Sequence, residues 1–393
     1  MKIRTLKINE IGGIKNLELS FHEGLNVICG ENGVGKTTIL NVIADAFGYA
    51  VHSRLKRYAL SREGSYDIEI SVENNGDAST EKKHVKIADF EPSSSRTVMG
   101  WRQYAGYLIN MGKNQELDYQ KLKAISNDPE RNPTVNSRLA VEGIPADGIK
   151  KWFVNRFLFA DKPGSLTKEQ NINFHLAKEV FHILDESVSF KTVNGSSLDI
   201  LLSTTKGDIY YEYLSSGYKS SINIILGLIK EIEYRTAEAP KNAESFEGII
   251  LIDEVDLHLH PSWQGKLVNA LKTILPKAQL IITTHSPHVL QTLDRNEIIP
   301  LTYDENGNTR LKELELGRFG LQGWTVEEIL KYVMEIPDTE SELYTETLKA
   351  YDEAMNREDK DEILRQYAAL KEMLHPGNIL NKLLDMQITE WED

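Results

Sequence analysis

Several stretches among the first ninety residues alternate apolar and polar positions. In "KIRTLKI" the apolar positions are taken by Ile3, Leu6 and Ile8, and a Gly-Gly turn leads into a second alternating stretch, "IKNLELSF". A period of two residues is typical of strands with one buried face. Residues 67–74 and 84–88 alternate in the same way, with the polar segment "NGDAST" between them. The pattern predicts two pairs of antiparallel strands at the amino terminus.

Farther along the chain, short continuous apolar runs replace the alternation. They are "GLNVICG" (24–30), "GIILIDE" (248–254) and "AQLIITTHS" (278–286). Runs of this kind suit strands that are buried on both faces. Stretches with helical spacing, such as 36–47 and 215–235, lie between them. Strands that alternate with helices predict an α/β fold with a mostly parallel core sheet.

The middle of the chain has less regular periodicity. We expect its polar segment "ISNDPERNPTVNSR" (125–138) to be an exposed loop, and we expect helices near 149–161 and 171–187. No sustained heptads or internal repeats are seen. The expected division is an amino-terminal lobe at 1–90, a mostly helical insertion at 91–195, a carboxy-terminal lobe at 196–322, and a helical tail at 323–393 that could bind a partner.

Composition narrows the functions that the chain can have. Its 393 residues carry a formal charge of -14, which argues against binding nucleic acid through bulk positive charge. One basic stretch, "SRLKRYALSR" (53–62), is better explained as a solvated helix face. The single Cys29 excludes an intramolecular disulfide and is expected to be a small buried hydrophobe. Without a membrane-spanning run or a signal-peptide pattern, we expect a cytoplasmic protein that does not bind membranes.

The segment "GENGVGKTT" carries the clearest chemistry. It matches Gly-x4-Gly-Lys-Thr and lies between an apolar run and a helical pattern, which is the context of a phosphate-binding loop. Backbone N–H groups and the positive end of the helix attract phosphate. Lys36 would contact the outer phosphates, and Thr37 would ligate Mg²⁺. The residues expected to bind nucleotide, in the form of ATP, are Gly30, Glu31, Asn32, Gly33, Val34, Gly35, Lys36, Thr37 and Thr38.

Three further motifs follow in order. The apolar run 249–252 ends in Asp253 and Glu254, where a parallel strand would deliver carboxylates for Mg²⁺ binding and for orienting the attacking water. "LSSGYKSS" opens a long helix, so Ser215 and Gly217 could form a second anion site, although a simple serine cap explains them as well. His285 follows a buried strand and could reach the γ-phosphate, although a lone histidine there is more often structural.

Taken together, the four motifs resemble ABC-type ATPases of the SMC, Rad50 and RecF kind. The segments "LSSGY", "LIDEVDLHLHPSWQ" and "TTHSPHVL" are similar to the bacterial family of predicted ATP-binding proteins involved in virulence. This family includes ATPase subunits of the Septu, retron-associated and PARIS anti-phage systems. The resemblance covers residues 1–50 and 200–295 well and the middle only loosely. It implies an ABC-type ATPase head with a P-loop NTPase core.

The resemblance also implies a division of labour between two chains. The nucleotide would be sandwiched between the phosphate loop of one copy and the Ser215–Gly217 turn of another, giving a homodimer or a higher even-numbered oligomer. Tyr218 replaces the glutamine that transporters have at this position. Asp256 would lie in the segment that links the two sites, and Gln103 is the candidate for the glutamine that senses Mg²⁺.

Three functions remain open at this stage. The favoured one is a Mg²⁺-dependent ATPase that regulates a partner effector, such as a nuclease encoded nearby, in anti-phage defence. The first alternative is a RecF- or Rad50-type repair ATPase that binds DNA directly, and the second is the nucleotide-binding subunit of a membrane transporter. His258 and His260 could seed a metal site, but we interpret them as structural because no ligand cluster accompanies them.

Overall fold

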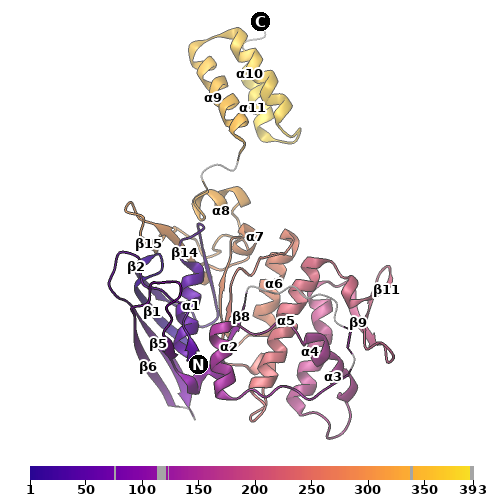
Figure 1. The fold of residues 1–393 in the computed structure, drawn as a ribbon. Coiled ribbons are helices and arrows are strands. Elements are labelled where there is room, and N and C mark those ends of the chain that lie inside the picture. Colours follow the sequence, from indigo (N-terminus) through magenta and orange to yellow (C-terminus); the bar gives the residue numbers. More distant parts are fainter. Residues whose placement is uncertain (75–76, 113–120, 123, 337–339, 390–393) are drawn as a thin grey trace. The chain divides into compact units, whose positions relative to one another are not determined.

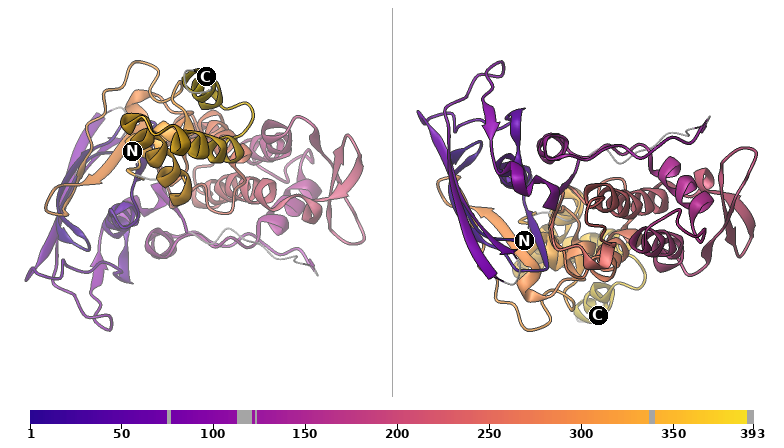
Figure 2. Two further views of the ribbon diagram at one scale, coloured as in Figure 1. Left: turned by 90° about the horizontal axis from the view of Figure 1, so that it is seen from above. Right: turned by 90° about the horizontal axis from the view of Figure 1, so that it is seen from below.

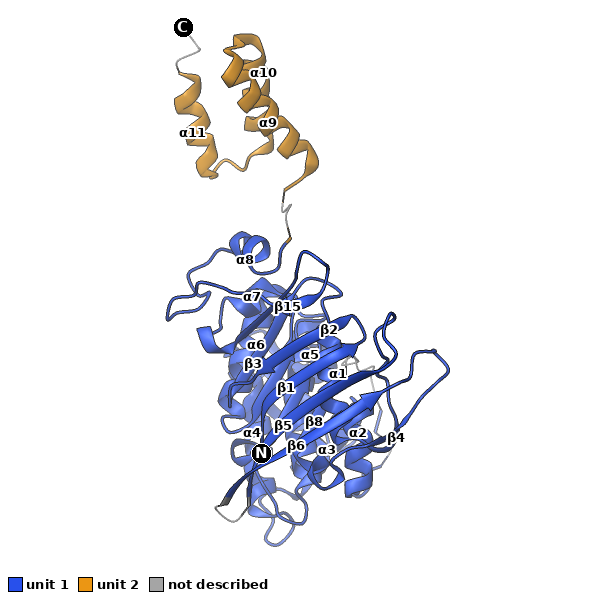
Figure 3. Cartoon of the chain, turned by 90° about the vertical axis from the view of Figure 1, so that its left-hand side faces the viewer, with its two compact units in different colours: residues 1–335 blue, residues 336–393 orange. Residues whose placement is uncertain are grey.

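The computed structural model describes residues 1–74, 77–112, 121–122, 124–336 and 340–389. The chain divides into two compact units, residues 1–335 and residues 336–393 (Figure 3). The boundary lies at 335 rather than at 322 because Ile329 and Val333 are fully buried in the core of the first unit.

The amino-terminal strands form an antiparallel sheet, as the alternation predicts. Its order is β2-β1-β5-β6 (Figure 3). Ile3, Leu6 and Ile8 are buried on its inner face. The strands β5 and β6 reach Asn74 and Asp77, so their connection is shorter than the predicted polar turn. The bounds are β1 Lys2–Ile11, β2 Ile14–Ser20, β5 Gly64–Asn74 and β6 Asp77–Ile87.

The core sheet has six strands in the order β15-β14-β3-β13-β12-β8. All neighbouring pairs are parallel except β14 with β15. This arrangement confirms the predicted α/β class, with a mixed, mostly parallel core sheet beside antiparallel amino-terminal strands. The bounds are β3 Leu25–Gly30, β8 Leu108–Met111, β12 Ile249–Ile252, β13 Gln279–Thr283, β14 Ile298–Tyr303 and β15 Thr309–Leu311.

Successive residues of the core strands point into two separate hydrophobic clusters. In β3, Val27 and Cys29 face the helical side, whereas Ile28 faces α1 and the antiparallel sheet. Both faces are therefore covered, which is why these strands read as continuous apolar runs. Burial raises the pKa of the Cys29 thiol to about 12, which suits a small buried hydrophobe.

Helices cover the face of the core sheet that points away from the antiparallel amino-terminal sheet (Figures 1 and 2). The helices of the first unit are α1 Lys36–Phe47, α2 Pro133–Glu142, α3 Ile149–Phe159, α4 Lys168–Leu184, α5 Ser216–Arg235, α6 Pro261–Ile274, α7 Pro287–Leu290 and α8 Val326–Tyr332. A small antiparallel sheet of β9 Val188–Val193, β10 Ile200–Thr204 and β11 Gly207–Tyr210 lies beside α4.

Two expectations for the middle of the chain need correction. The region 91–195 is not only a helical insertion, because β8 belongs to the core sheet and β7 (Thr97–Met99) pairs with β4 (Tyr49–His52). The predicted loop 125–138 contains the start of α2. The Asn132 side chain accepts hydrogen bonds from the amides of the first turn and caps that helix.

The basic stretch 53–62 is not a helix face. Lys56 donates to the carbonyls of Glu91 and Ser94, and Arg57 donates to several carbonyls of its own loop. These cations stabilise loop backbone, so the stretch does not present a uniform positive surface.

The second unit contains three helices packed on a small core, in agreement with the predicted helical tail. Tyr351, Ile363, Leu370 and Leu384 are buried between them. The bounds are α9 Glu342–Arg357, α10 Lys360–Met373 and α11 Ile379–Ile388. None of the described helices of either unit combines the length and the apolar character that a bilayer crossing requires.

Candidate functional site

The loop between β3 and α1 is shaped by glycines that other residues could not replace. Gly30 has φ 135° and Gly35 has φ 104°, both in the region that favours glycine. A Cβ on Gly30 would lie 2.2 Å from the Leu301 carbonyl oxygen, and one on Gly35 would lie 2.8 Å from the Ile14 side chain. The loop is therefore held tightly between β14 and the amino-terminal sheet.

Lys36 lies inside this loop. Its Nζ donates to the carbonyl oxygens of Gly30, at 2.8 Å, and of Glu31, at 2.7 Å. The side chain is buried, and burial lowers the pKa of its ammonium group. The two carbonyl dipoles thus stabilise the Lys36 ammonium. Phosphate oxygens could replace them as hydrogen-bond acceptors.

The other loop residues differ in exposure. Asn32 and Gly33 are exposed, Val34 is buried, and Thr38 contacts the turn at Gly12. The Glu31 carboxyl lies near that of Glu335, and burial together with this neighbour raises the pKa of Glu31. Glu31 of the loop therefore lies near Glu335, the last residue of the first unit, and no sequence motif predicts this proximity.

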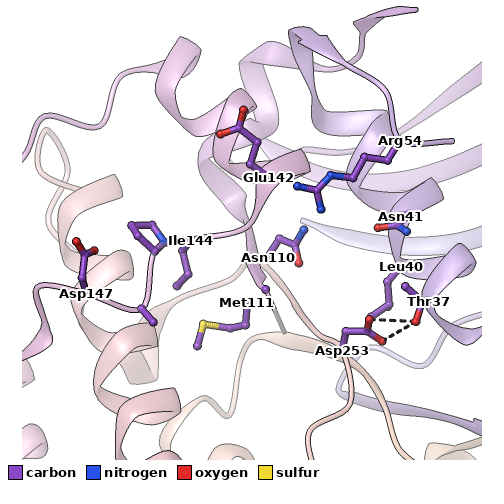
Figure 4. Close-up of a pocket in the computed structure, with 13 residues that line it drawn as sticks. Thr37, Leu40, Asn41, Arg54, Asn110, Met111, Glu142, Ile144, Asp147 and Asp253 are labelled. Atoms are coloured by element: carbon purple, nitrogen blue, oxygen red, sulfur yellow. Dashed lines mark hydrogen bonds between the residues drawn. The ribbon is translucent and has the colours of Figure 1, made fainter. Parts of the chain in front are cut away.

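Asp253 connects the two principal motifs. Its carboxylate accepts hydrogen bonds from the Thr37 hydroxyl at 3.0 Å (Figure 4) and from the Thr283 hydroxyl at 2.7 Å. Oxygen ligands of this kind are those that Mg²⁺ prefers. The described residues contain no group of three or more His, Cys, Asp or Glu side chains placed to hold a metal. The Thr37 hydroxyl and the Asp253 carboxylate therefore fit an ion that takes its remaining ligands from phosphate and water.

Glu254 and His285 lie at the same edge of the sheet. Glu254 has φ 51°, and its amide donates to the Thr283 hydroxyl at 2.7 Å. Asp256 accepts from the Thr284 hydroxyl at 2.6 Å and from the His285 amide at 3.2 Å. Burial, followed by the charge of Lys36, lowers the pKa of the His285 imidazole. Parallel strands β3, β12 and β13 bring these residues together because their carboxyl ends share one edge.

The Ser215–Gly217 turn is positioned by contacts with the start of α6. The Tyr218 ring stacks on Trp263 with centroids 4.8 Å apart, and a Cβ on Gly217 would lie 3.2 Å from the His260 amide nitrogen. The start of α5 therefore packs on the start of α6. Ser215 is exposed, and its side chain makes no capping hydrogen bond.

The two candidate metal histidines are found at this junction. His260 caps α6, with its Nδ1 2.8 Å from the Ser262 hydroxyl oxygen. His258 is exposed in the preceding turn, with φ 62°.

Gln103 does not reach the site. It lies in the 3₁₀ helix Arg102–Tyr107, before the first residue of β8. Because β8 runs parallel to β12 and pairs Met111 with Ile252, Gln103 belongs to the opposite edge of the sheet from Asp253. Residues 113–120, which follow β8, lie outside the described residues.

The structure adds residues that motif reading missed. A cavity of about 580 Å³ is lined by Thr37 and Asp253 together with Arg54, Asn110 and Glu142 (Figure 4). Asn110 is placed there by β8, a four-residue strand whose apolar run was too short to be recognised. Arg54 belongs to the basic stretch 53–62, which carries no nucleotide-binding motif.

Two family models match the chain in agreement with this geometry. One is described as an AAA domain and matches residues 5–140, and the other is described as an AAA ATPase domain and matches residues 160–290. Together with the fold and the loop-and-carboxylate arrangement, they define an ATP-hydrolysing enzyme of the P-loop class.

Among relatives, the Septu protein PtuA of Bacillus thuringiensis is 42% identical over 391 residues, which is 99% of this chain and 98% of that protein. The retron Ec83 probable ATPase of Escherichia coli is 26% identical over 288 residues, covering 72% of this chain and 49% of that protein. The SMC head domain from Thermotoga maritima shares 15% identity at a TM-score of 0.45, over 80% of this chain and 100% of that chain.

The full-length similarity settles the family: the chain belongs to the Septu PtuA family. The resemblance drawn from the four motifs is thereby confirmed, and the protein is an ATPase of the Septu and retron anti-phage type.

Proposed function

We propose that the protein binds ATP with Mg²⁺ between two copies of the chain and that this cycle regulates an effector nuclease in anti-phage defence. Within one copy, Lys36 would hold the outer phosphates, and Thr37 with Asp253 would ligate Mg²⁺. Glu254 would orient the attacking water, and His285 would contact the γ-phosphate. The ligand set around Asp253 supports these assignments.

The observation that carries the two-copy proposal is the state of the Ser215 turn. Ser215 precedes a helix of 20 residues, is exposed and makes no capping hydrogen bond, while Gly217 is buried against the start of α6. A helix start of this kind attracts anions. A second copy could therefore present its Ser215 and Gly217 to the nucleotide bound by the first.

The effector would bind the helical second unit. There α11 exposes Ile379, Leu383 and Met386, which lie on one helical face at spacings of four and three residues. An exposed apolar stripe on a small acidic helical unit is a feature of protein interaction surfaces.

The Ser215→Arg variant tests the sandwich. A bulky cation at this turn should abolish ATP-dependent dimerisation measured by light scattering. It should also lower ATP turnover by about 100-fold or more, as loss of a preorganised group in a catalytic site does. ATP binding to the single chain should remain, because the loop 30–38 is intact.

Ser165→Arg is the matched control. Ser165 is also an exposed serine at a turn, but it belongs to a different part of the chain, the connection between α3 and α4. Both variants should melt like the parent protein. Normal ATP-dependent association of Ser215→Arg would overturn the proposal.

The RecF-like alternative is not favoured by the structure. A RecF protein of Stenotrophomonas maltophilia matches only 94 residues, at 34% identity, covering 24% of this chain and 26% of that protein. Lys56 and Arg57, the cations in the centre of the basic stretch, are engaged by backbone carbonyls. We therefore propose a protein effector rather than duplex DNA as the direct partner.

A further inference from the structure

A second cavity, outside the nucleotide site, lies between the start of α3 and the second half of α5. Its volume is about 300 Å³. Three cationic side chains line it, Arg131, Lys151 and Lys230, together with the Tyr234 ring and the backbone at Gly148. The concentration of cations is unusual for a chain whose overall charge is strongly negative.

Lys230 is the most informative of these residues. The residue is only 2% exposed, and its Nζ donates to the Asp147 backbone carbonyl oxygen at 2.8 Å. No described carboxylate forms an ion pair with it, although a buried ammonium is costly unless a negative charge compensates it. A lysine ammonium has three donors, so two remain for a ligand in the cavity.

Two neighbouring groups also offer hydrogen-bond donors. The helix α3, of 11 residues, begins after Gly148, which has φ 76° and provides no side-chain cap for the amides of the first turn. Tyr234 is 9% exposed, and its hydroxyl donates no hydrogen bond to the residues that the structure describes. Helix amides, a hydroxyl and an ammonium are all donors, which is the complement of an anion.

The remaining charges do not cancel the positive potential. The Glu231 carboxylate pairs with Arg131, at 2.8 and 3.1 Å, and also with Arg235, so one carboxylate serves two guanidinium groups. The Lys151 ammonium donates to the Ser126 hydroxyl, which is uncharged. Asp147 is the one carboxylate among the lining residues that the structure describes. Burial lowers the pKa of Lys230, and the nearby Glu231 and Asp147 oppose this shift without cancelling it.

We propose that this cavity is a binding site for a phosphate-bearing anion, distinct from the ATP site. Lys230, Lys151 and the first amides of α3 would hold the phosphate oxygens, and the Tyr234 hydroxyl would donate a further hydrogen bond. The cavity volume of about 300 Å³ is far larger than one water molecule occupies, so it has room for a phosphate that carries a substituent.

The site is placed where its ligand can affect the ATPase. Pro145 and Asp147 line this cavity and also the larger cavity beside Thr37 and Asp253. The segment 144–148 is thus a common wall, and in Figure 4 it crosses the side of the larger cavity opposite the Thr37–Asp253 pair. A ligand that fixes this segment from one side would restrict its movement on the other.

The test uses the full-length chain carrying Lys36→Met, which removes the phosphate loop as a competing anion site. Inorganic phosphate is titrated by calorimetry, and adding Lys230→Met should weaken its binding by at least tenfold. Adding Lys206→Met, which removes an exposed lysine from the β10–β11 turn, should leave binding unchanged. Equal phosphate binding in all three proteins would overturn the proposal.

A second measurement does not depend on the folding of a variant. In the wild-type protein, phosphate should slow acylation of the Lys151 amine at least threefold, read by mass spectrometry of the labelled peptide. Lys206 in the same sample should be labelled at an unchanged rate. An unprotected Lys151 at phosphate concentrations that saturate the calorimetric site would contradict the assigned position.

Two further probes identify the source of the phosphate. Adenosine monophosphate represents a free phosphorylated molecule, and a fluorescent 15-nucleotide oligothymidylate represents nucleic acid. Binding of the monophosphate alone, with loss in Lys230→Met, assigns a small ligand. Binding of the oligonucleotide with the same loss assigns the phosphate to a nucleic acid strand. If Lys230→Met leaves the binding of both probes unchanged, the proposed site is refuted.

Discussion

The starts of α1 and α3 are built from similar parts. Each helix follows a glycine in the left-handed region, Gly35 with φ 104° and Gly148 with φ 76°, and neither has a side-chain cap. At each start a buried lysine, Lys36 or Lys230, donates to backbone carbonyl oxygens. Both ends therefore combine free helix amides with a desolvated ammonium.

The difference between them lies in where the lysine and the catalytic groups come from. At α1 the lysine belongs to the same loop, and strands β12 and β13 add carboxylates and a histidine. At α3 the lysine comes from a helix some eighty residues farther along the chain, and Asp147 is the one lining carboxylate that the structure describes. On the proposals made above, the first arrangement would carry out hydrolysis, whereas the second would bind an anion. The following changes test that contrast.

The largest effect is expected from Glu254→Gln. It removes the group that would orient water and should lower ATP turnover by about 100-fold or more while ATP binding persists. Phosphate binding at the α3 site should not change. Turnover is measured by phosphate release, with Glu244→Gln, an exposed residue before β12, as the control. Equal loss of ATP binding and turnover would contradict the role of Glu254.

Lys36→Met and Lys230→Met should separate the two sites. Loss of Lys36 should weaken ATP binding by about 100-fold, because a charge-assisted contact to the outer phosphates disappears from a partly desolvated site. Loss of Lys230 should change ATP binding less than about threefold. Fluorescent nucleotide titration measures both. A comparable loss in the two variants would mean that the ends of α1 and α3 form one site.

Gly30→Ala and Gly148→Ala compare how tightly the two regions are built. At Gly30 the added methyl group would meet the Leu301 carbonyl, so the free energy of unfolding should fall by about 3 kcal/mol. At Gly148 the nearest atom lies 4.0 Å away, and only the left-handed backbone is penalised, by about 1–2 kcal/mol. Urea unfolding distinguishes them. A larger loss at Gly148 would invert the comparison.

The smallest effect concerns pH. Burial lowers the pKa of Lys230, whose neighbours Asp147 and Glu231 oppose the shift and Arg131 adds to it. The ammonium form binds anions, and a lowered pKa means that it is lost at a lower pH than in a free lysine. Sulfate binding in the Lys36→Met background should therefore weaken several-fold between pH 8 and pH 10. The double variant with Lys230→Met should show a flatter profile.

The ATP-site motifs could be recognised from sequence because each is local. The loop 30–38 carries its glycines, lysine and threonine within nine residues, and Asp253 and Glu254 directly follow a buried strand. Because the carboxyl ends of parallel strands lie at the same edge of a sheet, the fold then brings these motifs together. Gln103 was misplaced because β8 is only four residues long, so its direction and its end were not visible in the pattern.

The amino-acid order by itself determined the α/β class, the antiparallel strands, the phosphate loop and the family, because periodicity and short motifs depend on neighbours in the chain. The tertiary structure alone decided that Tyr218 stacks on Trp263, that Glu31 meets Glu335, and that Lys230 reaches the start of α3. Such contacts join residues far apart in sequence, and only the packing of helices and sheets, which minimises exposed apolar surface over the whole unit, brings them within reach.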